Sequence, residues 1–199
     1  MRSFLISSAM VSLAVLSALA GCNNQNAARV YADVNWKLQC PPRGTAGCMA
    51  GCTEGVDRFI NGYSGDSGVR VTCNVTETAA DRFINFTIQN ASGQALTFEN
   101  VQVLRGGGSA ITGNVRLTDT NEFVGAAGGA SPSSAQPCQI SMVEFDRDTN
   151  GDARLAGQVL CQTMRAPADN TLCRGISAAS AGATVPVQFE IFACRGLNP

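Results

Sequence analysis

The chain has 199 residues, 45% of them hydrophobic and 15% charged, and its 14 basic and 15 acidic side chains give a formal net charge of −1. This length suits one globular domain with a substantial core. The balanced charge excludes the basic footprint with which proteins bind nucleic-acid phosphates. Because the chain contains no histidine, histidine-dependent triads, Cys–His pairs and histidine-ligated metal sites are excluded as well.

The first 22 residues combine one basic side chain with a long apolar stretch. Arg2 precedes an apolar run from Phe4 to Leu19, and the segment ends in Leu19-Ala20-Gly21-Cys22. A basic start, an apolar stretch and small residues at its end are typical of a signal peptide. The stretch is too short for a stable transmembrane helix. We therefore expect the chain to be exported.

The Leu19-Ala20-Gly21-Cys22 motif resembles the lipobox of bacterial lipoproteins. In that family the cysteine receives a diacylglyceryl group, the preceding peptide bond is cut, and the new amine is acylated with a fatty acid such as palmitate. The resemblance implies a signal peptide over residues 1–21, a lipidated N-terminus at Cys22 and a tether over residues 22–28. Several acyl chains on one residue give durable anchoring, because each buried methylene contributes about 0.8 kcal/mol.

The residue after the cysteine bears on the destination of the protein. In the same lipoprotein family an aspartate at this position favours retention at the inner membrane, and this chain has Asn23 there. The resemblance therefore implies the outer membrane and leaves open which face of it the domain occupies. The alternative is an ordinary secretory signal that is cut elsewhere.

Eight cysteines remain after Cys22, and an even number in an exported chain predicts up to four disulfides. The sequence leaves about 105 pairings open. Our hypothesis is that the first four pair among themselves and the last four likewise. The close spacing of Cys48 and Cys52 also suits a zinc ligand pair, but no histidine and no second close pair accompany it. The disulfide candidates are Cys40, Cys48, Cys52, Cys73, Cys138, Cys161, Cys173 and Cys194.

Apolar residues recur with a period of two from Val30 onward. Val69, Val71, Cys73 and Val75 alternate with polar residues, and a similar alternation runs over residues 185–191. Such alternation predicts half-buried strands of an antiparallel sheet. We expect about eight strands in an antiparallel β-sandwich, jelly-roll or immunoglobulin-like, forming a single domain over residues 29–199. The further predicted strands are 29–38, 84–89, 96–104, 111–117, 140–146 and 153–162.

Four segments interrupt this pattern. Residues 90–93 and 149–152 carry glycine after Asn or Ser and predict turns, the second a two-residue hairpin. Residues 48–61 have apolar spacing of three to four and suggest a helical turn. The composition of residues 125–137 and 177–184 predicts surface loops.

A loop with alternating oxygen-bearing side chains is the sharpest local pattern. Asp146, Asp148, Asn150 and Asp152 have the spacing of calcium ligands, and the run resembles the first half of an EF-hand loop. The twelfth position holds Gly157 in place of the bidentate glutamate of that family, and the flanks are strand-like rather than helical. Two interpretations stay open, a calcium site and a hairpin tip whose polar residues serve the turn. No other cofactor is indicated.

No recognisable catalytic motif is present, so we expect a protein that is not an enzyme. The carboxylates have no spacing that places two across a cleft, and Lys37 is the only lysine. Tyr31, Trp36 and Tyr63 suit either a sugar-stacking platform, a protein-binding hot spot or the core, and core packing is the favoured interpretation.

Together these patterns predict a lipid-anchored, non-catalytic protein of the bacterial cell envelope that presents a binding or structural surface at the outer membrane. The expected partners are the membrane, through the lipid on Cys22, and an envelope protein or polysaccharide, but not nucleic acid. One alternative is a calcium-dependent carbohydrate-binding module that uses the loop at residues 146–152. A second alternative is a hydrolase that works through carboxylates alone.

Overall fold

The computed structural model describes residues 29–49, 52–53, 55–128, 138–147, 153–179 and 184–196. These residues form eleven strands and no helix. Accordingly, no described helix is long and apolar enough to cross a membrane. The strands are β1 Tyr31–Gln39, β2 Asp57–Tyr63, β3 Arg70–Glu77, β4 Asp81–Gln89, β5 Ala95–Leu104, β6 Ala110–Thr118, β7 Glu122–Gly128, β8 Cys138–Arg147, β9 Ala153–Ala166, β10 Asp169–Ser177 and β11 Val187–Phe192.

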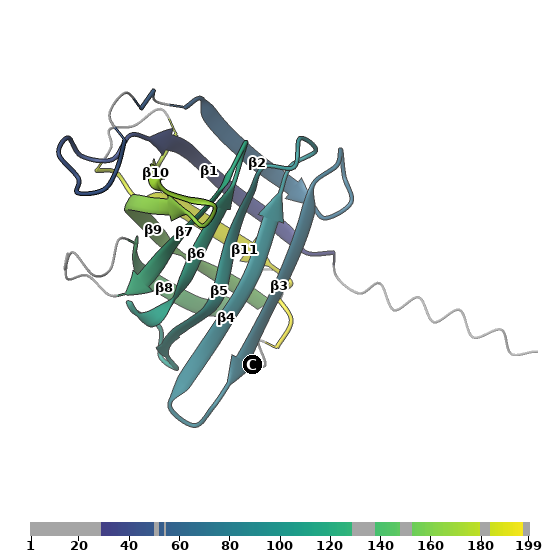
Figure 1. The fold of residues 1–199 in the computed structure, drawn as a ribbon. Helices are drawn as coiled ribbons and strands as arrows, with labels where there is room; N and C mark the ends of the chain where they lie inside the picture. The colour runs from purple at the N-terminus through teal and green to yellow at the C-terminus, as the bar shows by residue number, and fades with distance from the viewer. Residues whose placement is uncertain are drawn as a thin grey trace, which may run out of the picture.

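Strands β3 to β7 form the first layer of the fold, which we call the meander layer (Figure 1). Within this layer, consecutive strands pair antiparallel with one another, from β3 with β4 to β6 with β7. In β3, Val71, Cys73 and Val75 are buried, whereas Thr72 and Asn74 between them are exposed. The alternation therefore turns one face of the layer toward the core and the other toward solvent.

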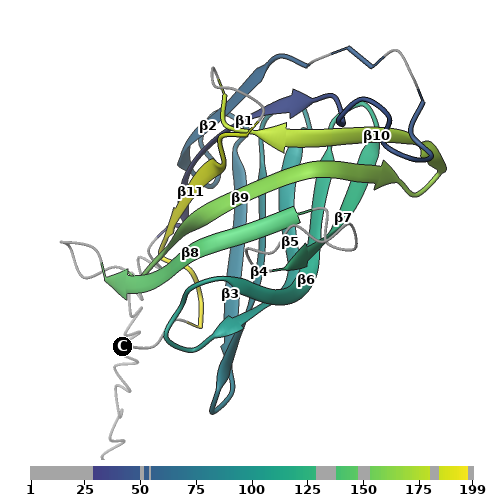
Figure 2. The same ribbon diagram turned by 90° about the vertical axis from the view of Figure 1, so that its left-hand side faces the viewer.

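The other six strands form the second layer, which we call the crossover layer and which runs across the meander layer (Figure 2). Within it, β10 and β11 share the space between β1 and β9. Strand β1 pairs with β10 over residues 37–39 and with β11 over residues 31–34. On their other side, strand β9 pairs with β11 over residues 154–159 and with β10 over residues 161–166. The two short strands thus act as one interrupted strand.

The two layers are joined at both rims. At one rim, β7 pairs parallel with β8 and also touches β9. At the other rim, the segment after β11 reaches the edge of β3. There the backbone N–H of Arg195 donates to the carbonyl of Cys73 (3.2 Å), and the carbonyl of Arg195 accepts from the N–H of Val75 (2.8 Å).

The core lies between the layers. The rings of Phe86 and Phe98, from the meander layer, stack at 4.2 Å between centroids. Phe189 of β11 meets them at 5.4 and 5.2 Å. Trp36 is 1% exposed in the same cluster. This contact between aromatic rings of both layers shows that they share one core.

The all-β, sandwich-like fold expected from the sequence is confirmed, but the strands number eleven rather than about eight. Strands β2, β7 and β10 were not expected. The helical turn expected over residues 48–61 is wrong, because residues 57–63 pair with β1 along their whole length. The loop expected over residues 125–137 is wrong for residues 125–128, which belong to β7; residues 129–137 lie outside the described residues.

Four disulfides connect the eight cysteines of the domain, as expected, but the expected grouping is wrong for two of them. Cys40–Cys52 and Cys138–Cys161 join cysteines within each half. Cys48–Cys173 and Cys73–Cys194 join the two halves, over 125 and 121 residues. The reason is topological, since β10 returns to the side of β1 and the segment after β11 returns to the edge of β3.

Candidate functional site

A cavity of about 530 Å³ lies along the edge and outer face of the meander layer. Thr72 and Asn74 of β3 line it and are exposed, so the cavity opens to solvent on this side. The residues that line it from the outer face carry hydroxyl, amide and carboxylate groups, and the basic residue Arg195 lines it as well. These residues are Thr72, Asn74, Asn85, Thr87, Thr97 and Glu99.

The register of three strands places these side chains in rows. Thr72 pairs with Thr87, which pairs with Thr97, and so three threonines stand side by side. Asn74 pairs with Asn85 in the next row. Directly paired residues of antiparallel strands lie on one face with Cβ atoms about 4.5–5.5 Å apart. The outer face of the meander layer therefore presents a compact set of hydroxyl and amide groups.

Some of these polar groups are already engaged within the protein. The Thr97 hydroxyl donates to the Thr87 hydroxyl (3.1 Å). The side-chain oxygen of Asn85 accepts from the backbone N–H of Asn100 (2.8 Å), at a point where the register of β4 and β5 shifts. Asn85 then keeps its two amide hydrogens, and Thr87 keeps its donor, for a further partner.

The negative charge in the cavity is neutralised by its neighbour. Glu99 accepts two hydrogen bonds from Arg116, at 2.7 and 3.1 Å. Arg116 also pairs with Glu122. The hydrogen bond with Glu99 raises the pKa of Arg116 above its ordinary value. A ligand therefore meets Glu99 as half of an ion pair.

The positive charge at the cavity comes from the segment that closes the rim. Cys194 is bonded to Cys73 of β3, with their Cα atoms 4.9 Å apart, and this fixes the neighbouring Arg195. Gly196 then passes so close to the Val75 carbonyl that a Cβ would collide with it, and its φ of +82° suits glycine. Arg195 is exposed, and it makes no ion pair within the described part of the chain.

The outer face of the crossover layer has a different chemistry. The rings of Tyr31 and Tyr63 meet at 5.1 Å between centroids, and Phe192 lies 5.7 Å from Tyr31. The guanidinium of Arg29 lies 5.6 Å from the Tyr63 ring centre. Burial raises the pKa of Tyr31 above its ordinary value, and the nearby Asp33 carboxylate adds to the rise. The sequence named two of these aromatic residues.

Trp36, the third aromatic residue that the sequence named, lies in the core rather than on the outer face. Trp36 points into the core, as the favoured interpretation expected, because it alternates with the outward-facing residues of β1. Tyr63 is 48% exposed and Tyr31 half-buried, so these two rings are outside the core, and the core packing expected for them is wrong. The single platform of three aromatics is therefore not formed.

The calcium candidate is described only at its first residue. Asp146 lies 3.2 Å from Arg154, which also pairs with Glu190 (2.5 Å) and Glu144 (3.6 Å). Asp148, Asn150 and Asp152 lie outside the described residues. Within the described ranges, no three His, Cys, Asp or Glu side chains are grouped so as to hold a metal ion. The Asp146 carboxylate is thus already balanced by an arginine.

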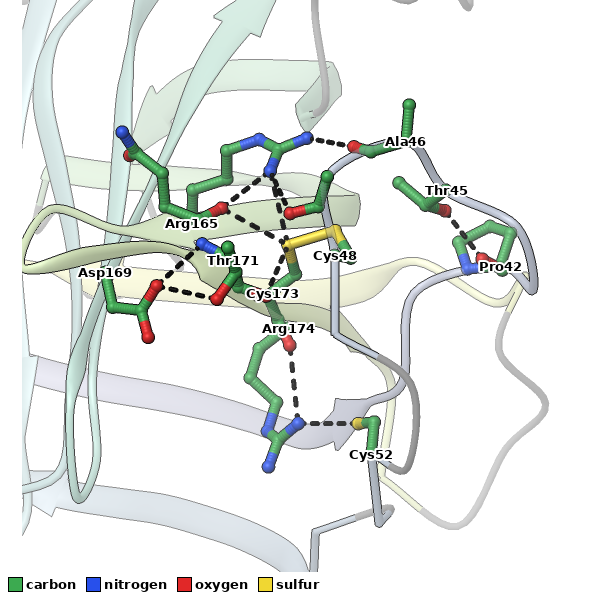
Figure 3. The surroundings of a disulfide bond; sticks show 12 residues. Pro42, Thr45, Ala46, Cys48, Cys52, Arg165, Asp169, Thr171, Cys173 and Arg174 are labelled. Carbon is green, nitrogen blue, oxygen red and sulfur yellow. Dashed lines mark hydrogen bonds between the residues drawn. A yellow bond between two sulfur atoms is a disulfide. The ribbon is translucent and has the colours of Figure 1, made fainter.

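A cysteine-rich loop at the end of the crossover layer engages two arginines (Figure 3). Arg165 donates to the carbonyls of Ala46 (2.6 Å) and Gly47 (3.0 Å). Arg174 lies 2.6 Å from the sulfur of Cys52. Cys48 is bonded to Cys173 and Cys52 to Cys40, so they do not form the zinc ligand pair that their spacing allowed. Arg165 and Arg174 therefore hold this loop in place through their contacts with its backbone and with Cys52.

Comparisons with known proteins complete the description of the site. No family model matches the chain, and no curated protein or solved structure matches it. Cys22 and the rest of residues 1–28 lie outside the described residues. The cavity residues were missed at the level of sequence, because they come from β3, β4, β5 and the segment after β11.

Proposed function

We propose that the protein is a lipid-anchored, non-catalytic component of the bacterial outer membrane that presents the outer face of its β-sandwich as a binding surface. The observation that carries the proposal is the Leu19-Ala20-Gly21-Cys22 motif directly after an apolar stretch. Lipid on Cys22 would hold the domain at the membrane through a tether at residues 22–28, without a spanning segment.

The eight paired cysteines support the same proposal. Disulfides persist in oxidising compartments such as the periplasm and the cell surface. All eight cysteines of the domain are paired, which leaves Cys22 as the one cysteine outside the four disulfides. A single cysteine that precedes the disulfide-bonded domain in the sequence suits lipid attachment.

Calcium-dependent carbohydrate binding at residues 146–152 is the first competing proposal. The pairing of Asp146 with Arg154 weighs against it, because a calcium ion would have to compete with a guanidinium for that carboxylate. A hydrolase that uses carboxylates alone is the second. Asp33 and Glu190 are paired neighbours on the crossover layer, but Glu190 is held by Arg154.

Cell fractionation with metabolic palmitate labelling tests the anchor. The wild-type chain should incorporate the label and sediment with outer membranes, whereas Cys22→Ala should lose the label and leave the membrane fraction. Asn24→Ala, which keeps the motif, is the control and should behave as wild type. Label-free wild-type protein, or Cys22→Ala that stays with the membrane, would contradict lipid anchoring.

A further inference from the structure

We propose that the cavity on the meander layer binds an acidic saccharide, whose hydroxyls meet the Thr and Asn side chains and whose carboxylate meets Arg195. This inference names the ligand class of the binding surface proposed above, and its geometry is independent of the lipid. A volume of about 530 Å³ is within the usual range of small-molecule sites.

The seven polar or charged lining residues favour a ligand rich in hydroxyl groups. The other five lining residues are Val30, Val71, Cys73, Phe86 and Phe98. Thr72 and Asn74 are exposed, and their side chains make no hydrogen bond within the described ranges. Asn85 and Thr87 keep donors after their internal bonds are counted. Rows of hydroxyl and amide groups match a sugar ring, whose free hydroxyls each act as both donor and acceptor.

The charges favour a ligand with an acidic group. Glu99 is held by Arg116 through two hydrogen bonds, whereas Arg195 makes no ion pair within the described part of the chain and is the cation left to meet a ligand. A guanidinium can form two parallel hydrogen bonds with a carboxylate, which adds geometric specificity as well as energy. One arginine suits a single carboxylate and is too little for a polyphosphate chain.

The edge of β3 argues against a peptide as the occupant. Peptides commonly bind to a sheet by adding a strand to an open edge. At the cavity this edge is taken, because Arg195 exchanges backbone hydrogen bonds with Cys73 and Val75. The Cys73–Cys194 disulfide holds this segment in place. A saccharide, which binds through side chains, needs no free edge.

The test is an array of immobilised uronic-acid, sialic-acid and muramic-acid oligosaccharides, each beside its uncharged counterpart. The probe protein is the full-length lipoprotein extracted in detergent. We expect binding to at least one acidic saccharide and at least tenfold weaker binding to its uncharged counterpart. Binding should fall at least tenfold in Arg195→Ala and in Asn74→Ala.

Arg43→Ala is the matched control, because it removes the same charge from an exposed position away from the cavity. Circular dichroism and melting of each variant establish that it is folded. The proposal is overturned if no acidic saccharide binds, if Arg195→Ala binds as wild type, or if Arg43→Ala weakens binding equally. Cys22→Ala that stays with the membrane and binds the saccharide as wild type does would refute the anchor alone.

Discussion

The two layers of the sandwich are assembled from very different parts of the chain. The meander layer consists of five consecutive strands, each paired with the next. The crossover layer joins β1 and β2 to strands more than 100 residues later. Three disulfides lie within the crossover layer and its loops: the local bridges Cys40–Cys52 and Cys138–Cys161, and the long-range bridge Cys48–Cys173. The meander layer takes part only in Cys73–Cys194.

This difference shows where cross-links contribute most. Pairing of distant segments costs more loop-closure entropy than pairing of neighbours in a hairpin. Disulfides remove part of that entropy from the unfolded chain. The crossover layer, which has the distant pairings, contains most of the disulfides. The meander layer has no disulfide on its outer face, and the cavity lies there.

The largest expected effect comes from removing a bridge that spans the layers. Cys73→Ser with Cys194→Ser should lower the free energy of unfolding by about 4–5 kcal/mol, because the bridge closes a loop of 121 residues. The Cys40–Cys52 bridge closes a loop of only 12 residues, so Cys40→Ser with Cys52→Ser should lower the free energy of unfolding by about 3 kcal/mol. Urea unfolding measures both values. Equal losses would contradict the role assigned to distant cross-links.

The next largest effect concerns the core that the layers share. Phe189→Ala should lower the free energy of unfolding by about 3–5 kcal/mol, because it leaves a cavity beside Phe86 and Phe98. Phe192→Ala, on the same strand but on the outer face, is the control and should cost far less. If thermal unfolding shows equal losses, the two layers do not meet at this ring.

A smaller effect concerns the ion pairs on the two outer faces. Arg154, which faces three carboxylates in the crossover layer, is 22% exposed, and Arg154→Ala should cost about 1 kcal/mol. Arg116, which faces two carboxylates in the meander layer, is 32% exposed, and Arg116→Ala should cost less. Both losses should shrink in high salt. A larger loss for Arg116→Ala would reverse this order.

The smallest effect is a pH dependence at the turn before β10. Hydrogen bonds from the hydroxyl and backbone N–H of Thr171 lower the pKa of Asp169 below its ordinary value of 3.8. A lowered pKa contributes stability above the unfolded value, and this is lost as the pH falls through the folded value. Asp169→Asn should therefore lose less stability than wild type between about pH 6 and pH 3. Identical acid profiles in thermal melts would contradict this role.

The same contrast explains which strands the sequence could predict. The strand expected at residues 69–75 is found as β3, because its buried positions are Val71, Cys73 and Val75. In β2 the inward positions are Arg58, Ile60 and Gly62, so the apolar alternation is absent. The inward-facing charge of Arg58 is balanced by an ion pair with Asp119.

Two other strands were hidden by their composition. The inward positions of β7 include Gly125 and Ala127, which are typical of a loop. The register shifts between β10 and β9 break the period of two. The cavity was hidden for a further reason, since its residues meet only after folding and Arg195 is held beside it by the Cys73–Cys194 bridge.

Mass spectrometry of the N-terminal peptide, from protein isolated out of the membranes of its source cells, tests the central proposal most directly. A lipid-anchored protein predicts that the mature chain begins at Cys22 and carries the mass of a diacylglyceryl group and an amide-linked fatty acid. A mature chain that begins at another residue, or at an unmodified Cys22, would contradict it.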